Sequence, residues 1–155
     1  MEIRMAKPED IPGLIDLLLQ VGEVHHKIRP DLFRAGARKY DEKALAEILK
    51  DPNRPIFAAV EDGTLLGYCF CILEITRDNP VLMNQKSLYI DDLCVDENCR
   101  GQHIGSVLYE AVKKFAKEQG CYNVTLNVWE CNPSARKFYE KAGLKPYKTC
   151  MEVIL

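Results

Sequence analysis

The sequence predicts an α/β (α+β) fold: a mixed, mostly antiparallel sheet of six to seven strands flanked by about four helices. Strand-like runs at 55–60 and 64–75 flank Glu61-Asp62-Gly63, and an Asp-Gly pair between such runs is typical of a β-hairpin. Residues 104–119 carry one continuous apolar stripe at helical spacing, and an alternating strand follows at 124–128. Hairpin-linked strands before a single β-α-β crossover indicate a mixed sheet.

The first third of the chain predicts one strand and two helices. Residues 2–6 alternate weakly, as a first strand would, and Pro8 is placed to begin a helix with apolar residues at helical spacing: Ile11, Leu14, Ile15 and Leu18. The polar, basic stretch 22–39 contains Pro30 and Gly36, so we expect a loop with some helical structure. Asp41 can cap a second helix that carries Leu45, Ile48 and Leu49.

The remaining elements follow from breakers and caps. Residues 87–95 form a third strand of the hairpin-linked run. Gly120 is placed to end the 104–119 helix. Asn132-Pro133 offers a cap and a first helical residue for a short helix that Gly143 ends, and residues 150–155 form the last strand.

Length and composition describe one ordinary globular domain, residues 1–155. Hydrophobic residues make up 47% of the chain, enough for one core, and charged residues 28%. A formal net charge of −2 gives no electrostatic reason to expect a nucleic acid or an acidic membrane as partner. The chain shows no window of about 18 apolar residues and no secretory signal at its start, so we expect a cytoplasmic protein.

The seven cysteines do not predict a metal site. They are Cys69, Cys71, Cys94, Cys99, Cys121, Cys131 and Cys150. Their number is odd, none form a C-x-x-C pair, and the three histidines do not complete a zinc-ligand pattern. We expect mostly buried, reduced thiols and no metal.

The segment 93–106 predicts an anion-binding loop. It reads strand, turn, glycine-containing loop and then an amphipathic helix that begins near Ile104. The first N–H groups of a helix lack partners and carry partial positive charge, which suits a phosphate or pyrophosphate. Arg100 could add a charge-assisted contact. The alternative, a plain tight turn, stays open at this point, and the segment is neither a Walker A loop nor a G-x-G-x-x-G fingerprint.

Two ordered motifs make the chain resemble the GNAT superfamily of N-acetyltransferases. The family signature [RQ]-x-x-G-x-[GA] reads Arg100-Gly101-Gln102-His103-Ile104-Gly105 here, with His103 at the usual fourth-position glycine. Residues 90–95 look like the family's fourth strand, and 132–144 like its N-x-x-A-x-x-F/L-Y-x-x-x-G-F/L block. The motifs cover 87–144, while the element order matches over essentially the whole chain. At His103 we expect a slightly reshaped loop, because positive φ is costly for a residue with a Cβ.

The resemblance implies acetyl-CoA as cosubstrate, a cofactor groove and an enzyme that acetylates a primary amine of a small molecule or peptide. Backbone groups of the strand, at Leu93, Cys94 and Val95, would pair with the pantetheine arm. Backbone N–H groups of the loop would hold the pyrophosphate, through Arg100, Gly101, Gln102, His103, Ile104, Gly105 and Ser106. Asn132 and Tyr139 would lie near the thioester.

The transfer needs a base for the amine and an acid for the departing thiolate. Tyr139 is the candidate acid; the alternative is that it only packs on its helical face. Asp91 is the candidate base, because the proposed base of polyamine acetyltransferases aligns with it. Asp91 and Asp92 are adjacent in an apolar strand, so we expect them on opposite faces. Glu130 is a second candidate base.

The resemblance implies that the segment between the first two helices lines the acceptor site, although adjacent histidines in a loop can also be incidental. The candidate residues are His25, His26, Asp92 and Asn127; Asn127 stands where ribosomal-protein acetyltransferases carry a glutamate. The acceptor could be an amino acid, a polyamine, an aminoglycoside or a protein N-terminus, and the last strand could pair across a homodimer. The alternatives are a non-catalytic acyl-CoA-binding regulatory module and a nucleotide-binding protein unrelated to CoA.

Overall fold

The computed structural model describes all residues from 1 to 155 and contains one five-stranded sheet. The strands lie in the order β1-β2-β3-β4-β5; the pairings from β1 to β4 are antiparallel, and β5 runs parallel to β4. The strands are β1 (Glu2–Met5), β2 (Ile56–Glu61), β3 (Thr64–Thr76), β4 (Gln85–Val95) and β5 (Asn123–Leu126). The helices are η1 (Pro8–Asp10), α1 (Ile11–Ile28), α2 (Glu42–Ile48), η2 (Glu97–Cys99), α3 (Ile104–Glu118) and α4 (Pro133–Lys141).

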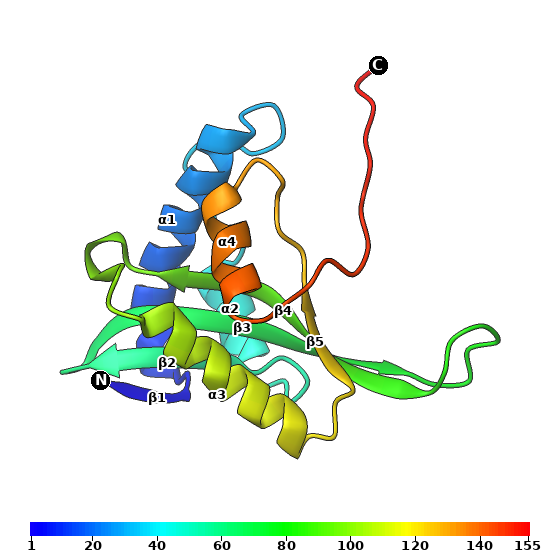
Figure 1. Ribbon diagram of the computed structural model, residues 1–155. Helices are drawn as coiled ribbons and strands as arrows, with labels where there is room; N and C mark the ends of the chain where they lie inside the picture. Colours follow the sequence, from blue (N-terminus) through cyan, green and yellow to red (C-terminus); the bar gives the residue numbers. More distant parts are fainter.

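The sheet separates two apolar cores (Figure 1). Leu14 and Leu18 of α1 and Leu45 of α2 pack on one face, together with Tyr68 and Phe70 of β3. Leu108 and Val112 of α3 pack on the other face, and the segment that ends α4 covers its border. The alternation of β3 side chains between these cores is what a strand buried on both faces requires.

The local signals in the sequence are confirmed. Asp62 and Gly63 have φ of 49° and 79°, the two positive values that a tight hairpin turn needs. The Asp41 side chain accepts a hydrogen bond from the backbone N–H of Ala44 at 2.8 Å and so caps α2. Gly120 and Gly143 have positive φ just after α3 and α4.

Helix α1 is longer than predicted, because the sequence indicated a loop from Gly22 onward. It continues through Gly22 to Ile28, so His25 and His26 lie on a helix and only the rest of the 22–39 stretch is irregular. Gly22 does not break the helix; a Cβ there would collide with the carbonyl oxygen of Ala37, so this glycine allows the following loop to approach α1.

The prediction of a last strand is wrong for this structure, and the sheet has five strands rather than six or seven. Residues 150–155 form no strand and extend away from the body (Figure 1). A strand needs hydrogen-bond partners along an edge, and these residues pair with none. Within the segment, the Glu152 carboxylate accepts a hydrogen bond from Arg29 at 2.6 Å. None of the helices has the length and hydropathy that crossing a membrane would require.

Candidate functional site

The sheet opens between β4 and β5. These strands pair only from Ser87 with Asn123 to Ile90 with Leu126, after which β4 continues to Val95 while the other chain segment leaves the sheet. The β4 edge beyond Ile90 therefore faces no strand on that side. Unpaired backbone groups of this kind accept an extended chain as an added strand would.

A β-bulge lies at the point where the strands part. Phe70 pairs with Asp92 and the next pair in β4 involves Ile90, so Asp91 is an extra residue without a partner. Ile90 and Leu93 consequently both contact the α3-side core, although three positions separate them. The expectation that Asp91 and Asp92 face opposite sides is wrong: both bind side chains on the α1 and α2 face.

Each oxygen of the Asp91 carboxylate accepts one hydrogen bond. Its Oδ1 accepts from Nζ of Lys39 at 2.6 Å, and its Oδ2 accepts from the hydroxyl of Tyr40 at 2.8 Å. Arg54 donates in turn to the Tyr40 oxygen at 2.8 Å. Burial and the hydrogen bond to Asp91 raise the pKa of Tyr40 to about 12, so this hydroxyl keeps its proton and remains a donor.

Asp92 has a different environment. Its Oδ2 accepts a hydrogen bond from the hydroxyl of the buried Tyr68 at 2.8 Å. Desolvation raises the pKa of Asp92, while the Tyr68 hydrogen bond and the charges of Lys39 and His25 act against that increase. A carboxyl with a raised pKa, beside an open strand edge, is a candidate proton acceptor.

Tyr139 reaches the same opening from α4, on the opposite face of the sheet. Its ring packs edge-on against Phe138 at 5.1 Å between centroids, and its hydroxyl makes no hydrogen bond within the protein. Desolvation first, then the nearby charges of Cys69 and Asp92, raise the pKa of Tyr139. The phenol is therefore protonated at neutral pH and free to donate its proton.

The loop before α3 forms a row of free backbone donors. The N–H groups from Gly101 to Ser106 make no hydrogen bond with protein acceptors, and the first bond of this end runs from Val107 N–H to the His103 carbonyl. Gly101 has φ of 81° and His103 has φ of 62°, which turns the chain before the helix starts. Six unpaired donors at the positive end of a helix have the chemistry that suits a phosphate group.

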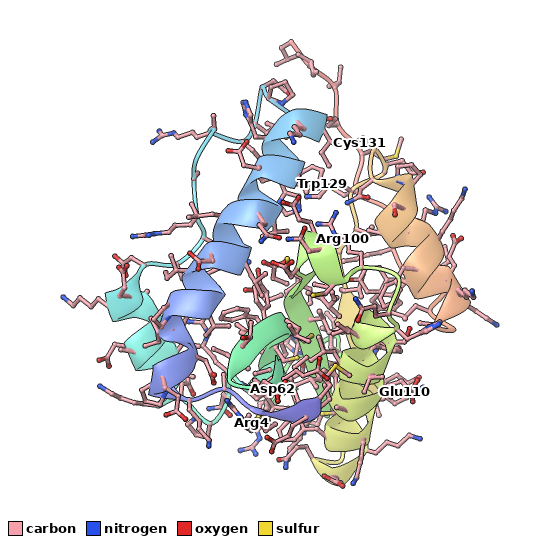
Figure 2. The ribbon with its side chains drawn as sticks, turned by 90° about the vertical axis from the view of Figure 1, so that its left-hand side faces the viewer. Arg4, Asp62, Arg100, Glu110, Trp129 and Cys131 are labelled. Atoms are coloured by element: carbon pink, nitrogen blue, oxygen red, sulfur yellow. The ribbon has the colours of Figure 1, made fainter.

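Arg100 and the packing of Gly105 complete this end of the opening. Arg100 Nε donates to the Val95 carbonyl at 3.4 Å, and the residue lies with Trp129 between α1 and α4 (Figure 2). A Cβ at Gly105 would stand 3.4 Å from the Phe138 ring, so the start of α3 lies directly against α4.

Changing His103 tests whether its backbone strain matters. A residue with a Cβ in the left-handed region is strained by about 1–2 kcal/mol. Glycine removes this strain, but part of the gain is offset because glycine also gives the unfolded chain more conformational freedom. We expect His103→Gly to leave the free energy of unfolding equal or up to about 1 kcal/mol higher. His103→Val should lower it by about 1–2 kcal/mol, because a β-branched residue fits this φ worst. Urea unfolding of both variants measures the difference; equal stability of the two would show that the loop relaxes freely.

The remaining sequence candidates lie around this opening in different ways. The His25 ring stacks on Phe33 at 5.0 Å, and Nδ1 of His26 is 2.7 Å from the Phe33 carbonyl oxygen. Phe33 also meets Trp129 edge-on at 5.3 Å, so an aromatic contact joins the segment after α1 to the segment after β5. Asn127 donates to the Tyr89 hydroxyl at 3.1 Å.

Glu130 and Asn132 are both committed to local contacts. The Glu130 carboxylate is 85% exposed and forms a two-pronged ion pair with Arg136, at 2.6 and 2.7 Å. The Asn132 side chain accepts from the Ala135 N–H at 3.1 Å and caps α4. The exposed Glu130 carboxylate is thus paired with a cation, while the side-chain amide NH2 of Asn132 has no hydrogen-bond partner within the protein.

Most of the basic residues after α1 are also paired within the chain. Arg29 binds Asp31 as well as Glu152, Arg38 binds Glu42, and Lys39 binds Asp91. All seven cysteines are free, with Cys69, Cys71 and Cys94 buried and Cys131 and Cys150 exposed. No group of three or more metal-ligating side chains is present.

Sequence reasoning missed two tyrosines of this site. Tyr40 and Tyr68 bind the two adjacent carboxylates, but a tyrosine in an apolar strand or beside a helix start is usually a packing residue. In the β3–β4 register Tyr68 pairs with Cys94 and is a diagonal neighbour of Asp92, and a bulge directly beside this pair hides the relation in the sequence.

The chain is similar to known acetyltransferases. The profile of the Acetyltransferase (GNAT) family matches residues 22–144. Thialysine N-epsilon-acetyltransferase from Bos taurus is 26% identical over 149 residues, covering 91% of this chain and 82% of that protein. Glucosamine 6-phosphate N-acetyltransferase from Arabidopsis thaliana is 36% identical over 90 residues, covering 50% of this chain and 58% of that protein. A crystal structure of a mutant of the BH1408 protein from Bacillus halodurans superimposes with a TM-score of 0.95 at 30% identity, covering 100% of this chain and 99% of that one.

Proposed function

Since this chain belongs to the acetyltransferase (GNAT) family, we propose that it moves an acetyl group directly from acetyl-CoA to the primary amine of a small molecule or peptide. Family membership makes it an N-acetyltransferase and implies both acetyl-CoA and an acceptor that carries an amine. The further proposals are the class of acceptor, a single domain over residues 1–155, and Tyr139 as general acid.

The row of six free N–H groups beside the open β4 edge is the observation that carries the proposal. The donors from Gly101 to Ser106 would hold the pyrophosphate, with Arg100 beside them. The edge from Leu93 to Val95 would pair with the amide-containing arm, and Arg100 would have to release the Val95 carbonyl that it now contacts. Acetyl-CoA supplies an activated acetyl thioester.

Tyr139 would protonate the thiolate that leaves when the amine nitrogen bonds to the acetyl carbon. Its free hydroxyl and raised pKa support this role, because an acid has to carry its proton at the working pH. Its position on α4, beside the opening, supports contact with the sulfur end of the arm.

The acceptor is tested with a panel of amines and two measurements. We expect acetyl-CoA at about 100 times its Kd to add about 2.7 kcal/mol, which raises the Tm of a chain of this size by about 5–10 °C. Release of the CoA thiol is then followed with thialysine, lysine, glucosamine 6-phosphate, an aminoglycoside, spermidine and a peptide with a free N-terminus. Turnover with at least one amine supports the proposal. Binding of acetyl-CoA without turnover contradicts it and favours a binding module, and a shift with nucleotides alone contradicts the cofactor.

A further inference from the structure

Two adjacent carboxylates lie at the opening of the sheet, but only one has an oxygen available to a substrate. We propose that Asp92, and not Asp91, binds the acceptor ammonium and takes its proton, and that the acceptor presents a single alkyl ammonium. This inference rests on the proposed acetyl transfer and adds to it the identity of the base and the charge of the acceptor.

Both oxygens of Asp91 already have hydrogen-bond partners, and one of these partners is a cation. Lys39 and Tyr40 occupy its two oxygens at 2.6 and 2.8 Å, and its side chain is 11% exposed. A base must reach the proton that it removes, and Asp91 would first have to give up an ion pair. Its contacts instead tie the segment before α2 to β4, which makes Asp91 a positioning residue.

Asp92 combines burial with one available oxygen. Its Oδ2 accepts from Tyr68 at 2.8 Å, whereas its Oδ1 has no hydrogen bond. That oxygen is not sealed inside the protein, because Asn123 Oδ1 is the single unpartnered side-chain polar atom that solvent cannot reach. A substrate cation would interact most favourably with this oxygen, because the oxygen is accessible, has no hydrogen-bond partner and belongs to a desolvated carboxyl.

The bulge explains why Asp92 faces the acceptor side. Without the extra residue at Asp91, strand alternation would turn Asp92 toward the α3-side core, where Ile90 and Leu93 lie. The same bulge stands where β5 leaves the sheet. The available carboxylate and the space that β5 vacates therefore occur at one place.

Asp92 as base and Tyr139 as acid, on opposite faces of the sheet, together account for every proton that moves in the reaction. Asp92 accepts one proton from the ammonium and later returns it to solvent. The freed nitrogen bonds to the acetyl carbon, the C–S bond breaks with its electron pair on sulfur, and Tyr139 gives its proton to that thiolate. The proton that the nitrogen loses on becoming an amide restores the phenol through solvent. Two groups with opposite duties, base and acid, are the arrangement that one active site needs.

The charges around Asp92 suit one ammonium rather than several. Asp91 is neutralised by Lys39 and Glu130 by Arg136, so Asp92 is the one carboxylate of the three without a cationic partner. The titratable groups that act on Asp92 or are acted on by it are Tyr68 on β3, Lys39 before α2, His25 on α1, Asp91 on β4, Tyr139 on α4, and the thiols of Cys69 and Cys94. His25 stacks on Phe33, which meets Trp129, and aromatic faces of this kind bind alkyl ammonium chains.

The test compares Asp92→Asn with Asp91→Asn, and uses Asp16→Asn as a control because Asp16 is an exposed α1 residue outside the site. The wild-type substrate is the amine of the panel with the highest turnover. We expect Asp92→Asn to lower kcat/KM about a hundredfold or more and to abolish the decline of kcat/KM on the acid side. Asp91→Asn should lower it less than about tenfold and keep that acid limb. Asp16→Asn should match the wild type.

Folding is separated from chemistry by two further measurements. Asparagine at position 92 can still accept from Tyr68, so the Tm shift with acetyl-CoA should persist. Asp92 has a raised folded pKa, so it binds protons more tightly when folded and lowers stability as pH rises; Asp92→Asn should therefore raise Tm at neutral pH. A loss of activity with a gain in Tm would support the proposal.

Three results would overturn it in distinguishable ways. A hundredfold loss in Asp91→Asn with near-normal activity in Asp92→Asn would return the role of base to Asp91. Normal activity in both variants would exclude each aspartate as the base. Higher kcat/KM for spermidine or the aminoglycoside than for glucosamine 6-phosphate and a lysine-free peptide, the two panel members with one amine, would refute the single ammonium. No turnover by the wild type with any amine would instead refute the proposed function itself.

Discussion

Tyr139→Phe should lower kcat and kcat/KM together by about a hundredfold, because a general acid acts only as the transition state forms. The change removes one oxygen and keeps the ring that packs on Phe138. KM for acetyl-CoA and the Tm shift it produces should stay the same. Since burial raises the pKa of Tyr139 above its ordinary value of about 10, wild-type activity should show no decline from this group between about pH 8 and 10.

Tyr122→Phe is the matched control, because Tyr122 is 78% exposed and follows α3 outside the site. It should retain wild-type kinetics. If Tyr139→Phe stays within about threefold of the wild type, Tyr139 serves packing alone and water protonates the thiolate.

Local chemistry made most of the fold predictable. Asp62-Gly63, the Asp41 cap and the glycines after α3 and α4 each set backbone angles within a few residues, so the sequence contains the information directly. The last strand could not be predicted in this way. Residues 150–155 have strand-like composition, but a strand exists only where a partner edge is available.

Candidate site residues could be selected from the sequence, whereas their geometry could not. The loop 100–106 and Tyr139 were identifiable because the motifs contain them in order. The bulge at Asp91 was not, because a bulge is a property of the pairing between β3 and β4 and leaves no mark in β4 alone. One unpaired residue reversed the side on which Asp92 lies, and that reversal transfers the available carboxylate from Asp91 to its neighbour.

The second large effect is expected far from the opening, at the start of α1. Asp10 is a buried carboxylate whose oxygens accept from Arg4 at 2.7 and 2.9 Å and from the Lys7 N–H at 2.7 Å. These bonds fasten β1 to the helix that carries His25. Arg4→Met should lower the free energy of unfolding at pH 7 by about 3 kcal/mol, because it leaves a buried charge without its partner.

The pH dependence gives this prediction its sign. The Arg4 hydrogen bond holds the pKa of Asp10 in the folded protein below its ordinary value. The stabilisation from this ion pair is therefore complete above the pKa of Asp10 in the unfolded chain, and it is lost as pH falls through the pKa of Asp10 in the folded protein. In Arg4→Met the unpaired carboxyl protonates more readily, so the deficit against the wild type should shrink from pH 7 to about pH 4. Urea unfolding at both values measures it, with Arg34→Met as control, because Arg34 is exposed and forms no ion pair.

The double variant Arg4→Met with Asp10→Asn distinguishes two causes of the stability loss: the lost attraction between the two charges, and the burial of an unpaired Asp10 carboxylate. An asparagine can still accept from the Lys7 N–H, so the cap at the helix start survives while the charge is gone. If the unpaired carboxylate causes the loss, the double variant should recover more than half of the lost stability, because it no longer buries an unpaired charge. A double variant as unstable as Arg4→Met would mean that the arginine acts through its packing, and the expected shrinkage of the deficit at low pH would then be absent too.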